Sequence, residues 1–559
     1  MAMRRGAGYR RNINLIGGMH VRGLATAHDV FLFPDSPLGE LPARLELACA
    51  ANEMRSLQII VEATREVQMS INDAQFELEV YEMRAVPVEY NTGDGVEQGG
   101  AMVISPDQCP PYAIRRAPFW VYDCLSPCTN GRVPARDGRA ALYCCVRPIE
   151  PMTPGLHDLT LTLNCDGQMT RISLALKAYP VSIPKEHFSV INWYSERAIS
   201  RFHATTPGTP QHEAMRYKYA LAMRRARQTH VLVSFTPECV TGSDPWTFDF
   251  SRQREQIATF KRAGIKGLTL GCMLSRGSLP DGTPDMYTDV FRCALRPDID
   301  FETEAGYALS VRFCQAVAAF LRENGWEHDV SFQIHDEPDV HYRGSLDARR
   351  RQYFLAASLL RRYIPGVQIC EAVSGTAFAG GIDIWVPITT GYEKQRAEFE
   401  RLQALGEQVW SYVCCGPEGF YLNRFLDSPL IRPRLLFWGF AAYGISGYLH
   451  WGFNQFHDGM DPFKGTSCPN NTGIGTSFPC GDAFIVYPGE QGPLLSMRLE
   501  AQRRGAQDAE LLGMLKSRDP EAAARIIGRV FRSNSDYCED CATFEANYAE
   551  LLNALCTSK

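Results

Sequence analysis

The 559-residue sequence lacks the features that would place it in a membrane or on a nucleic acid. No window is apolar over the length that a membrane-spanning helix needs. The formal net charge is −6, whereas a nucleic-acid-binding chain is expected to carry a basic surface. We therefore expect neither a membrane nor a nucleic acid as a partner.

The N-terminus also lacks a recognisable secretory signal. Residues 1–18 contain four arginines, but no apolar core follows them. We expect a cytoplasmic protein, or a secreted one if a signal was removed from the sequence. The sequence leaves the oligomeric state open, a homo-oligomer included.

The cysteines lack the spacing of a disulfide framework or a metal site. There are 19 of them, an odd number, mostly within apolar runs such as Cys144-Cys145 and Cys414-Cys415. Cys538-x-x-Cys541 has the spacing of a zinc knuckle, but no second pair lies at a suitable distance. We expect no metal and no cofactor, with most cysteines acting as small apolar residues. Whether any of them pair stays open.

The sequence does contain a change in the pattern of its apolar residues near residue 185. A chain of this length is expected to form several domains. After an N-terminal extension (1–25), residues 26–184 consist of short, often alternating apolar runs separated by Pro, Gly and Asp, which predicts an antiparallel β-sandwich. Asp166-Gly167 between two such runs predicts a hairpin.

Residues 185–480 alternate strand and helix patterns, which predicts a (β/α)8 TIM-type barrel. The connection between the fifth and sixth strands is short for a helix. Residues 481–559 predict a short strand and helices that pack, or form a small appended domain, without chemistry of their own. The expected barrel strands are Ser189–Trp193, Val231–Phe235, Gly267–Gly271, Ser331–His335, Gln368–Glu371, Ile382–Val386, Gln408–Val413 and Gly447–Trp451.

The fourth of these strands ends in His335-Asp336-Glu337-Pro338, with two adjacent carboxylates. Buried carboxylates are costly unless paired, and polar residues at the C-terminal end of a barrel strand are usually catalytic. Glycosidases use a carboxyl group to protonate the leaving oxygen and a second group to stabilise the anomeric carbon. Adjacent residues suit a substrate-assisted reaction, in which the 2-acetamido oxygen of the sugar is the nucleophile.

The stretch His335-Asp336-Glu337-Pro338 resembles the catalytic signature of glycoside hydrolase family 123, the β-N-acetylgalactosaminidases, and of the wider family called domain of unknown function 4091. Two further regions are similar to the family's N-terminal and C-terminal segments. They are Ala51-Asn52-Glu53 with Gln58, and Gly481-Asp482-Ala483-Phe484, Tyr487-Pro488-Gly489 and Ser496-x-Arg498-x-Glu500.

The resemblance implies a retaining glycosidase that removes terminal β-linked N-acetylgalactosamine or a related N-acetylhexosamine. By this resemblance, an ionised Asp336 would orient the acetamido group and Glu337 would be the general acid and base. The second role needs a Glu337 pKa raised towards neutrality, which burial and a neighbouring charge favour. The related family is understood to act without a metal. The loop between Pro462 and Cys480 lies near the expected site. Its sequence does not decide whether a pocket for the acetamido group is retained.

Aromatic and polar residues near strand ends are candidates for binding a carbohydrate, because aromatic faces can stack on sugar C–H groups. Several such residues from different strands favour a carbohydrate cleft, although each alone is more often a core residue. The candidates are His335, Trp193, His230, Trp385, Tyr392, Trp410, Tyr412, Trp451 and Asn454.

Three alternatives stay open. A glycosidase of other specificity would pair Asp336 or Glu337 with a distant carboxylate such as Glu238, Glu371 or Asp458. A non-catalytic carbohydrate-binding protein would bind glycans without hydrolysing them. A metal site would use alternating ligands, His335, Glu337, Asp339 and His341, but Pro338 disrupts the extended geometry that it requires.

Overall fold

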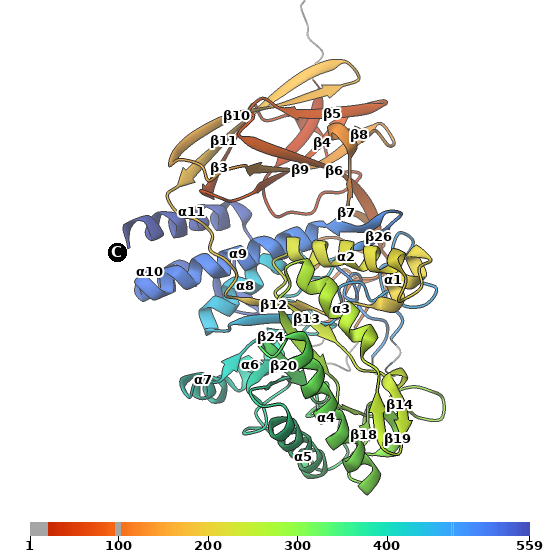
Figure 1. Cartoon of the computed structure of the whole chain (residues 1–559). Helices are drawn as coiled ribbons and strands as arrows, with labels where there is room; N and C mark the ends of the chain where they lie inside the picture. The colour runs from red at the N-terminus through yellow and green to blue at the C-terminus, as the bar shows by residue number, and fades with distance from the viewer. Residues whose placement is uncertain (1–20, 95–101, 471, 473–474, 559) are drawn as a thin grey trace, which may run out of the picture.

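The structure is a computed structural model that describes residues 21–94, 102–470, 472 and 475–558 (Figure 1). Most of the expected N-terminal extension (1–25) and three positions of the loop between Pro462 and Cys480 lie outside the described residues. Among the residues that are described, no helix combines the length and apolar character that crossing a bilayer requires.

The N-terminal region is built from two packed sheets. Its strands, together with two from near the C-terminus, are β1 (Arg22–Thr26), β2 (Gly39–Glu40), β3 (Arg44–Ala50), β4 (Arg55–Glu62), β5 (Glu66–Ile71), β6 (Phe76–Val88), β7 (Phe119–Pro127), β8 (Arg132–Pro134), β9 (Arg139–Pro148), β10 (Gly155–Cys165), β11 (Gln168–Tyr179), β26 (Tyr487–Gly489) and β27 (Gly492–Ser496). One sheet has the order β2-β1-β4-β9-β6-β7-β27-β26 and the other β3-β11-β10-β5-β8. Leu57 and Leu142 of the first share an apolar cluster with Leu161 and Leu174 of the second. The sheet-rich N-terminal region predicted from the apolar runs is therefore present.

The predicted hairpin is confirmed. Strands β10 and β11 pair antiparallel from Gly155↔Ala178 to Cys165↔Gln168, and Asp166 and Gly167 form the turn. Both turn residues have positive φ, 51° and 93°, as a two-residue hairpin loop requires.

The C-terminal segment is an integral part of the molecule and not an appended end. Strand β27 pairs with β7 through Leu495↔Leu125, so the tail extends the larger N-terminal sheet. Helices α9 (Met497–Arg518), α10 (Pro520–Gly528) and α11 (Cys541–Thr557) form a layer between the two sheets and the rest of the chain (Figure 1). The segment thus packs against the smaller N-terminal sheet through α11 and against helix α8 through α9.

Each of the eight predicted strand positions between residues 185 and 480 holds a strand. They are β12 (Ser189–Asn192), β13 (His230–Val233), β16 (Gly267–Gly271), β20 (Val330–Gln333), β21 (Gln368–Val373), β22 (Ile384–Pro387), the split pair β23 (Gln408–Val409) and β24 (Ser411–Tyr412), and β25 (Gly447–His450). All their pairings are parallel, but among the described residues they form two sheets, β13-β16-β20-β21-β22-β23 and β12-β25-β24. The single closed ring that a (β/α)8 barrel implies is thus not present as one hydrogen-bonded sheet.

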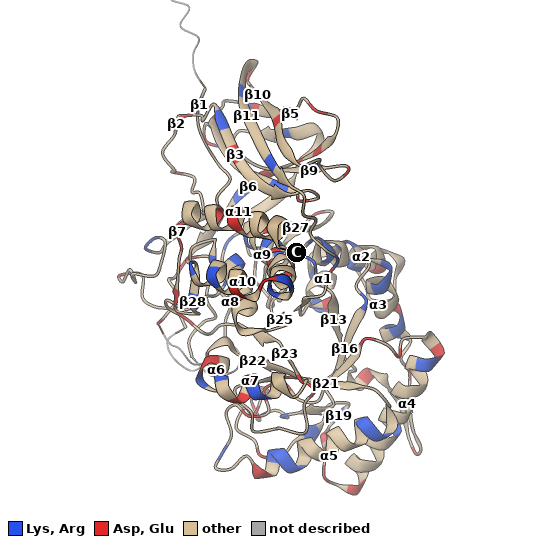
Figure 2. Cartoon of the chain, turned by 90° about the vertical axis from the view of Figure 1, so that its left-hand side faces the viewer, with Lys and Arg blue, Asp and Glu red and all other residues tan. Residues whose placement is uncertain are grey.

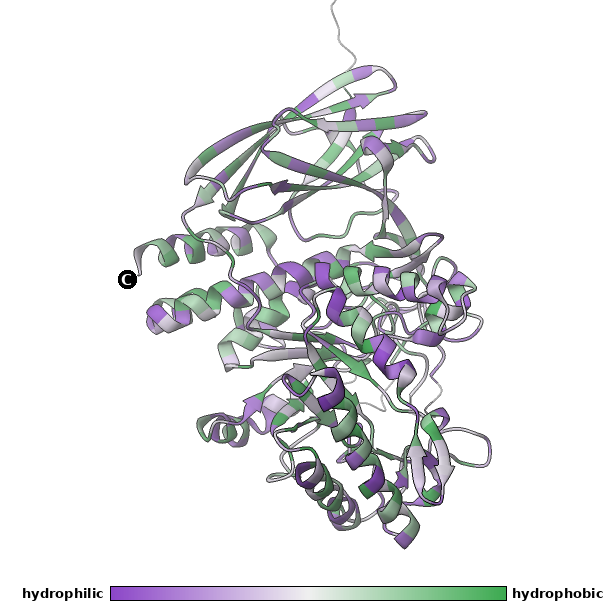
Figure 3. Cartoon of the chain, in the orientation of Figure 1, coloured by the Kyte–Doolittle hydropathy of each residue, from purple (hydrophilic) through white to green (hydrophobic). Residues whose placement is uncertain are grey.

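Helices lie between most of these strands. They are α1 (Glu196–His203), α2 (Pro210–Arg225), α3 (Ser251–Arg262), α4 (Glu304–Asn324), α5 (Asp347–Tyr363), α6 (Thr389–Lys394), α7 (Arg396–Ala404) and α8 (Arg432–Tyr443). As the short spacing predicted, the described chain between β21 and β22 contains no helix. Figure 3 shows apolar strands at the centre, while helices such as α4 and α5 carry apolar and polar faces. Charges of both signs are interspersed over the outer helices (Figure 2).

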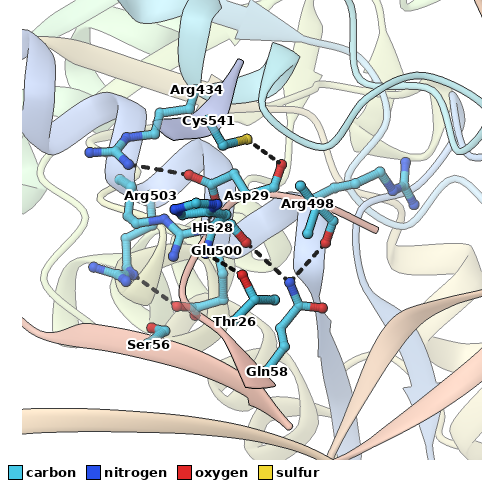
Figure 4. A network of polar contacts seen from close by, with 12 residues as sticks. Thr26, His28, Asp29, Ser56, Gln58, Arg434, Arg498, Glu500, Arg503 and Cys541 are labelled. Carbon is cyan, nitrogen blue, oxygen red and sulfur yellow. Dashed lines mark hydrogen bonds and ion pairs between the residues drawn. The ribbon is translucent and has the colours of Figure 1, made fainter. Parts of the chain in front are cut away.

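A set of buried charges, here called the ionic layer, joins the N-terminal sheets to the helices below them. Arg434 of α8 contacts Asp508 of α9 at 2.7 Å, Glu545 of α11 at 2.8 Å and Asp29, after β1, at 3.2 Å. Arg504 also pairs with Asp29. Nearby, Gln58 Nε2 donates hydrogen bonds to the carbonyl oxygens of His28 and Val30 (Figure 4).

Three stretches that carry the family resemblance meet around this layer, far from Asp336 in sequence. The Tyr548 hydroxyl donates a hydrogen bond to Glu53 at 2.7 Å, and Arg225 pairs with Glu500 at 2.5 Å. Arg498 bonds to Asp123 at 3.0 Å and to the carbonyl oxygen of Gly481 at 2.6 Å. These signature residues therefore hold the parts of the chain together.

Candidate active site

Strand β20 ends at Gln333, and the chain beyond it is held by a buried carboxylate on the next strand. Glu371 of β21 accepts hydrogen bonds from the backbone N–H groups of Ile334, at 3.0 Å, and His335, at 3.1 Å, and from the Tyr353 hydroxyl. Burial raises the pKa of Glu371 well above its usual range, against the lowering effect of the His335 N–H bond. Glu371 thus positions the segment that carries Asp336 and Glu337.

The backbone at Glu337 explains how two adjacent carboxylates can face the same space. Neighbouring side chains on a strand point to opposite faces. Glu337, however, lies beyond the strand and has φ of 50°, a left-handed conformation that is uncommon outside glycine. Such backbone strain is concentrated at functional sites. The turn brings Asp336 and Glu337 to one cavity.

This cavity, here called the catalytic cavity, has a volume of about 410 Å³. Among its described lining residues, Asp336 and Glu337 are the only carboxylates. Rings and thioethers form much of the remaining wall. The lining residues are Met102, Trp193, Arg276, Pro284, Met286, Asp336, Glu337, His341, Ala372, Tyr412, Cys414, Cys415, Leu449, Trp451, His457, Thr472 and Phe478.

Three side chains contact the carboxylate pair directly or through its backbone. The Tyr412 hydroxyl donates a hydrogen bond to Glu337 Oε1. Gln333 Nε2 donates to Asp336 Oδ1 at 3.3 Å, and an Arg276 guanidinium N–H donates to the carbonyl oxygen of Glu337 at 2.8 Å. These contacts fix the orientation of both carboxyl groups.

The carboxyl group of Asp336, which the family resemblance implied to be ionised, has a raised pKa in this site. Burial and the charge of Glu337 raise the pKa of Asp336 to about 7, against the opposing effects of Arg276 and Gln333. The physical reason is that two carboxylates this close cannot both ionise easily in a buried site. Asp336 therefore titrates close to neutral pH, where its protonated and ionised forms are both populated.

A second cavity, of about 350 Å³, shares Glu337, His341 and Tyr412 with the first and is here called the polar cavity. Its other lining residues include Asp339, Ser374, Thr390 and Lys394. Asp339 accepts hydrogen bonds from the backbone N–H groups of Ser374 and Gly375 at 2.9 Å, and burial raises its pKa to about 6. Glu337 is thus common to an aromatic cavity and a polar one.

The structure brings three of the predicted carbohydrate-binding residues to the catalytic cavity, namely Trp193, Tyr412 and Trp451. Trp451 follows β25 and packs against Phe478 with ring centroids 5.3 Å apart. Phe478 and Thr472 belong to the loop between Pro462 and Cys480, so this loop forms part of the cavity wall. Its position agrees with the rim location that the sequence indicated.

Two predicted histidines lie elsewhere. His335 is buried and stacks on Phe291 with ring centroids 4.1 Å apart, so its ring belongs to the core behind the site. His230 begins β13, at the opposite end of the strand from the carboxylates, and contacts Trp410 edge-on at 5.1 Å. His230 is distant from the site because only the C-terminal ends of the parallel strands face it.

Four further predicted residues are also outside both cavities because they satisfy core or backbone contacts. Trp385 donates a hydrogen bond to Glu407, and Tyr392 donates to the carbonyl oxygen of Tyr443 at 3.0 Å. Trp410 is buried against His230. Asn454 accepts from the Ser195 N–H at 2.8 Å and donates to its carbonyl oxygen at 3.2 Å.

The distant carboxylates considered as partners do not line the catalytic cavity. Glu371 is committed to the backbone after β20, Glu238 is exposed in a short turn after β13, and Asp458 forms surface ion pairs with Arg197 and Arg201. Within the described part of the chain, no three of the histidine, cysteine and carboxylate side chains are grouped so that they could hold a metal ion.

Several lining residues escaped the sequence analysis. Arg276 and Met286 lie in the long connection between β16 and α4, where no strand-end pattern marked them. His341 was considered only as a metal ligand, and it lines both cavities. Cys414 and Cys415 directly follow the seventh predicted strand, Gln408–Val413, so the end of that strand was the one available signal for them.

Comparison with known proteins adds independent evidence. Residues 186–515 match the family model described as the catalytic domain of glycoside hydrolase 123. No curated protein sequence matches the chain. A family 123 glycoside hydrolase from Clostridium perfringens, described in connection with glycolipid glycan hydrolysis, aligns over 96% of this chain and 97% of its own with a TM-score of 0.67 and 12% identity. A family 39 glycoside hydrolase from Bacteroides cellulosilyticus WH2 aligns over 83% and 82%, with a TM-score of 0.34 and 12% identity.

Proposed function

The chain belongs to glycoside hydrolase family 123, and from this membership we propose that it is a retaining, exo-acting hydrolase of terminal β-linked N-acetylgalactosamine or a related N-acetylhexosamine. The observation that carries the proposal is that the only carboxylates among the described lining residues of the catalytic cavity are adjacent. A conventional retaining glycosidase needs a second carboxylate about 5 Å away, across the scissile bond. The substrate's own acetamido group supplies the nucleophile when that carboxylate is missing.

In the proposed reaction the acetamido oxygen attacks the anomeric carbon as Glu337 protonates the departing oxygen. Asp336, ionised once substrate is bound, accepts a hydrogen bond from the acetamido N–H and stabilises the positive charge of the oxazolinium. Glu337 would carry the proton that it transfers, and the Tyr412 hydroxyl orients its carboxyl group. Glu337 next removes a proton from water, which opens the oxazoline with net retention.

The two cavities suggest where the two parts of the substrate lie. Trp193, Trp451 and Phe478 give the catalytic cavity aromatic surfaces for the acetamido sugar. The leaving group would then enter the polar cavity, whose Thr390 and Lys394 can hydrogen-bond its hydroxyl groups. A general acid must reach the oxygen between these two parts, and Glu337 lines both cavities.

The proposal extends to the architecture. We infer that the two parallel sheets are parts of one (β/α)8-type barrel over residues 185–480, because each connection between neighbouring strands returns the chain to the same direction. Residues 26–184 would be a β-sandwich domain, and residues 481–559 a C-terminal segment that joins the two. The similarity to the Clostridium perfringens enzyme over 96% of the chain supports a shared arrangement of all three parts.

A panel of nitrophenyl glycosides tests the function, with both 2-acetamido epimers and their 2-hydroxy counterparts assayed on wild type and Glu337→Gln. We expect turnover of a 2-acetamido substrate alone, inhibition by the matching thiazoline, and lower turnover in the variant. Full activity on a sugar without the acetamido group would contradict substrate assistance. Binding of glycans without hydrolysis in any assay would contradict the assigned roles of both carboxylates.

A further inference from the structure

Two adjacent cysteines form part of the wall of the catalytic cavity, and the proposed reaction does not use them. Cys414 and Cys415 both line the cavity, and their sulfur atoms lie 3.8 Å apart. Their exposed fractions are only 6% and 5%, and both residues are part of the lining of this cavity. The pair therefore lies where a bound sugar would have to fit.

The local chain explains why both sulfurs reach the same space. Strand β24 ends at Tyr412, and the Cys414 N–H donates a hydrogen bond to the carbonyl oxygen of Gly416 at 2.8 Å. Asn423 Nδ2 then donates to the carbonyl oxygens of Cys414 and Pro417, each at 3.0 Å. The chain is thus held in a turn, which breaks the alternation that would send neighbouring side chains to opposite faces.

The second adjacent pair in the chain, Cys144-Cys145, provides a matched contrast. Both residues lie within strand β9, where Cys144 is opposite Leu57 and Cys145 opposite Ser56 on β4. Cys144 belongs to the apolar cluster between the two N-terminal sheets, whereas Cys145 belongs to the large cluster on the other side. The sulfur atoms of Cys144 and Cys145 therefore face different apolar clusters and cannot bind one ligand together.

The surroundings of Cys415 determine which reagents it can meet. The hydrogen bond with Cys414, burial and the charges of Asp482 and Glu337 raise the pKa of the Cys415 thiol. A thiol that stays protonated reacts slowly with alkylating agents and peroxides, because the thiolate is the nucleophile. A trivalent arsenical carries its own base, since each hydroxide on arsenic leaves as water with one thiol proton.

We propose that Cys414 and Cys415 form a dithiol site for trivalent arsenicals inside the catalytic cavity, and that its occupation prevents substrate binding. An arsonous acid, R–As(OH)2, condenses with the two thiols, so that two As–S bonds form, two As–O bonds break and two water molecules leave, with no change in oxidation state. The second As–S bond is intramolecular, which strengthens binding by about 10²-fold or more over a single thiol. The inhibition, though not the binding, rests on the proposed position of the sugar.

The full-length reduced protein, treated with phenylarsine oxide, tests the binding by intact mass and by peptide mapping. We expect one phenylarsenic unit, bound with the loss of two hydrogens and mapped to Cys414-Cys415, in wild type and in Cys144→Ala. Cys414→Ala and Cys415→Ala should each lose this adduct, and Cys538→Ala should keep it. An adduct that persists in Cys415→Ala, or one that maps to another pair, would refute the site.

Hydrolysis measured on the same samples tests the consequence. We expect half-inhibition of wild type at about 10²-fold less arsenical than each single variant requires, because each variant offers one thiol only. Excess 2,3-dimercaptopropanol should restore activity, whereas the monothiol 2-mercaptoethanol at equal thiol concentration should not. An adduct at Cys414-Cys415 that leaves turnover unchanged would overturn the placement of the sugar beside it. If wild type has no glycosidase activity at all, the proposed function fails, while the mass measurement still decides the dithiol site.

Discussion

In the ionic layer each buried carboxylate lies against an arginine, whereas at the end of β20 Asp336 lies against another carboxylate. Burial works against the charge of Glu545, yet Arg55 and Arg434 hold the pKa of Glu545 at about 2. At the catalytic cavity, burial and Glu337 act in the same direction and raise the pKa of Asp336 to about 7. The same chemical group is thus kept ionised where it holds the fold together, and it titrates near neutral pH where it lies beside another carboxylate.

The ionic layer and the catalytic cavity also contribute differently to stability. Charges in the ionic layer are paired, so their burial is offset by attraction and hydrogen bonds. The two carboxylates of the cavity repel each other, and Glu337 keeps a left-handed backbone. This repulsion and the left-handed backbone are unfavourable. Contacts elsewhere offset them, such as the hydrogen bonds of Glu371 to the segment after β20.

The largest effect is expected from breaking the ionic layer with Arg434→Met. Asp29, Asp508 and Glu545 would then share too few counter-charges, and removing one partner of a buried ion pair typically costs about 3 to 5 kcal/mol. Urea unfolding followed by tryptophan fluorescence measures the loss. Arg434→Lys keeps the positive charge but not the several N–H donors of the guanidinium. Its free energy of unfolding should lie between those of wild type and the methionine variant. A methionine variant as stable as wild type would show that the layer is not what holds the regions together.

Removing the proposed acid from the cavity, in Glu337→Gln, should lower turnover strongly without destabilising the fold. We expect a loss in kcat of about 10³-fold, equivalent to about 4 kcal/mol, on a disaccharide whose leaving group needs protonation. The loss should be smaller on a nitrophenyl glycoside, because nitrophenolate leaves without a proton. Equal losses on both substrates would argue against the role of acid, and the control is a stability in urea no lower than that of wild type.

Asp336→Asn should raise stability at neutral pH, the reverse of a change in the ionic layer. The pKa of Asp336 is about 7 in the folded protein against 3.8 as the ordinary value, so the unfolded chain ionises first as the pH rises. Wild type therefore loses stability between about pH 4 and pH 7, roughly 1 to 3 kcal/mol, and the asparagine variant does not. Thermal unfolding from pH 4 to pH 8 measures the growing difference.

Glu545→Gln is the control, because it should change stability at neutral pH in the direction opposite to that of Asp336→Asn. The pKa of Glu545 is depressed to about 2, so its contribution is present above about pH 4.5 and is lost as the pH falls towards 2. The variant should be less stable than wild type at pH 7 and approach it in acid. If both variants shifted stability in the same direction at pH 7, the contrast between the two regions would be wrong.

The smallest expected effect separates two tryptophans that the sequence treated alike. Trp451→Ala should raise KM about tenfold, near 1.4 kcal/mol, because Trp451 lines the catalytic cavity. Trp410→Ala should leave KM unchanged and lower the unfolding free energy, since Trp410 is buried against His230. Steady-state kinetics and urea unfolding on both variants test this. A change in KM for the Trp410 variant alone would reverse the assignment.

Local patterns were enough to predict much of the fold. Alternating and apolar runs placed each of the eight strands between residues 185 and 480, because strand and helix periodicities depend on neighbours in sequence. The turn at Asp166-Gly167 was predictable for the same reason. Pairing of β27 with β7 was not, since its residues lie more than 350 positions apart and no local signal records that contact.

For the candidate site, the sequence by itself determined the adjacent carboxylates, the strand that they follow and the family to which they point, because these are properties of consecutive residues. Only the tertiary structure decided which aromatic residues join them. Trp193 and Trp451 reach the cavity, while Trp385 and Trp410 are buried in the core, although all four were predicted at or near strand ends. The raised pKa of Asp336 was also decided by the fold, because it depends on burial and on the turn that brings Glu337 beside it.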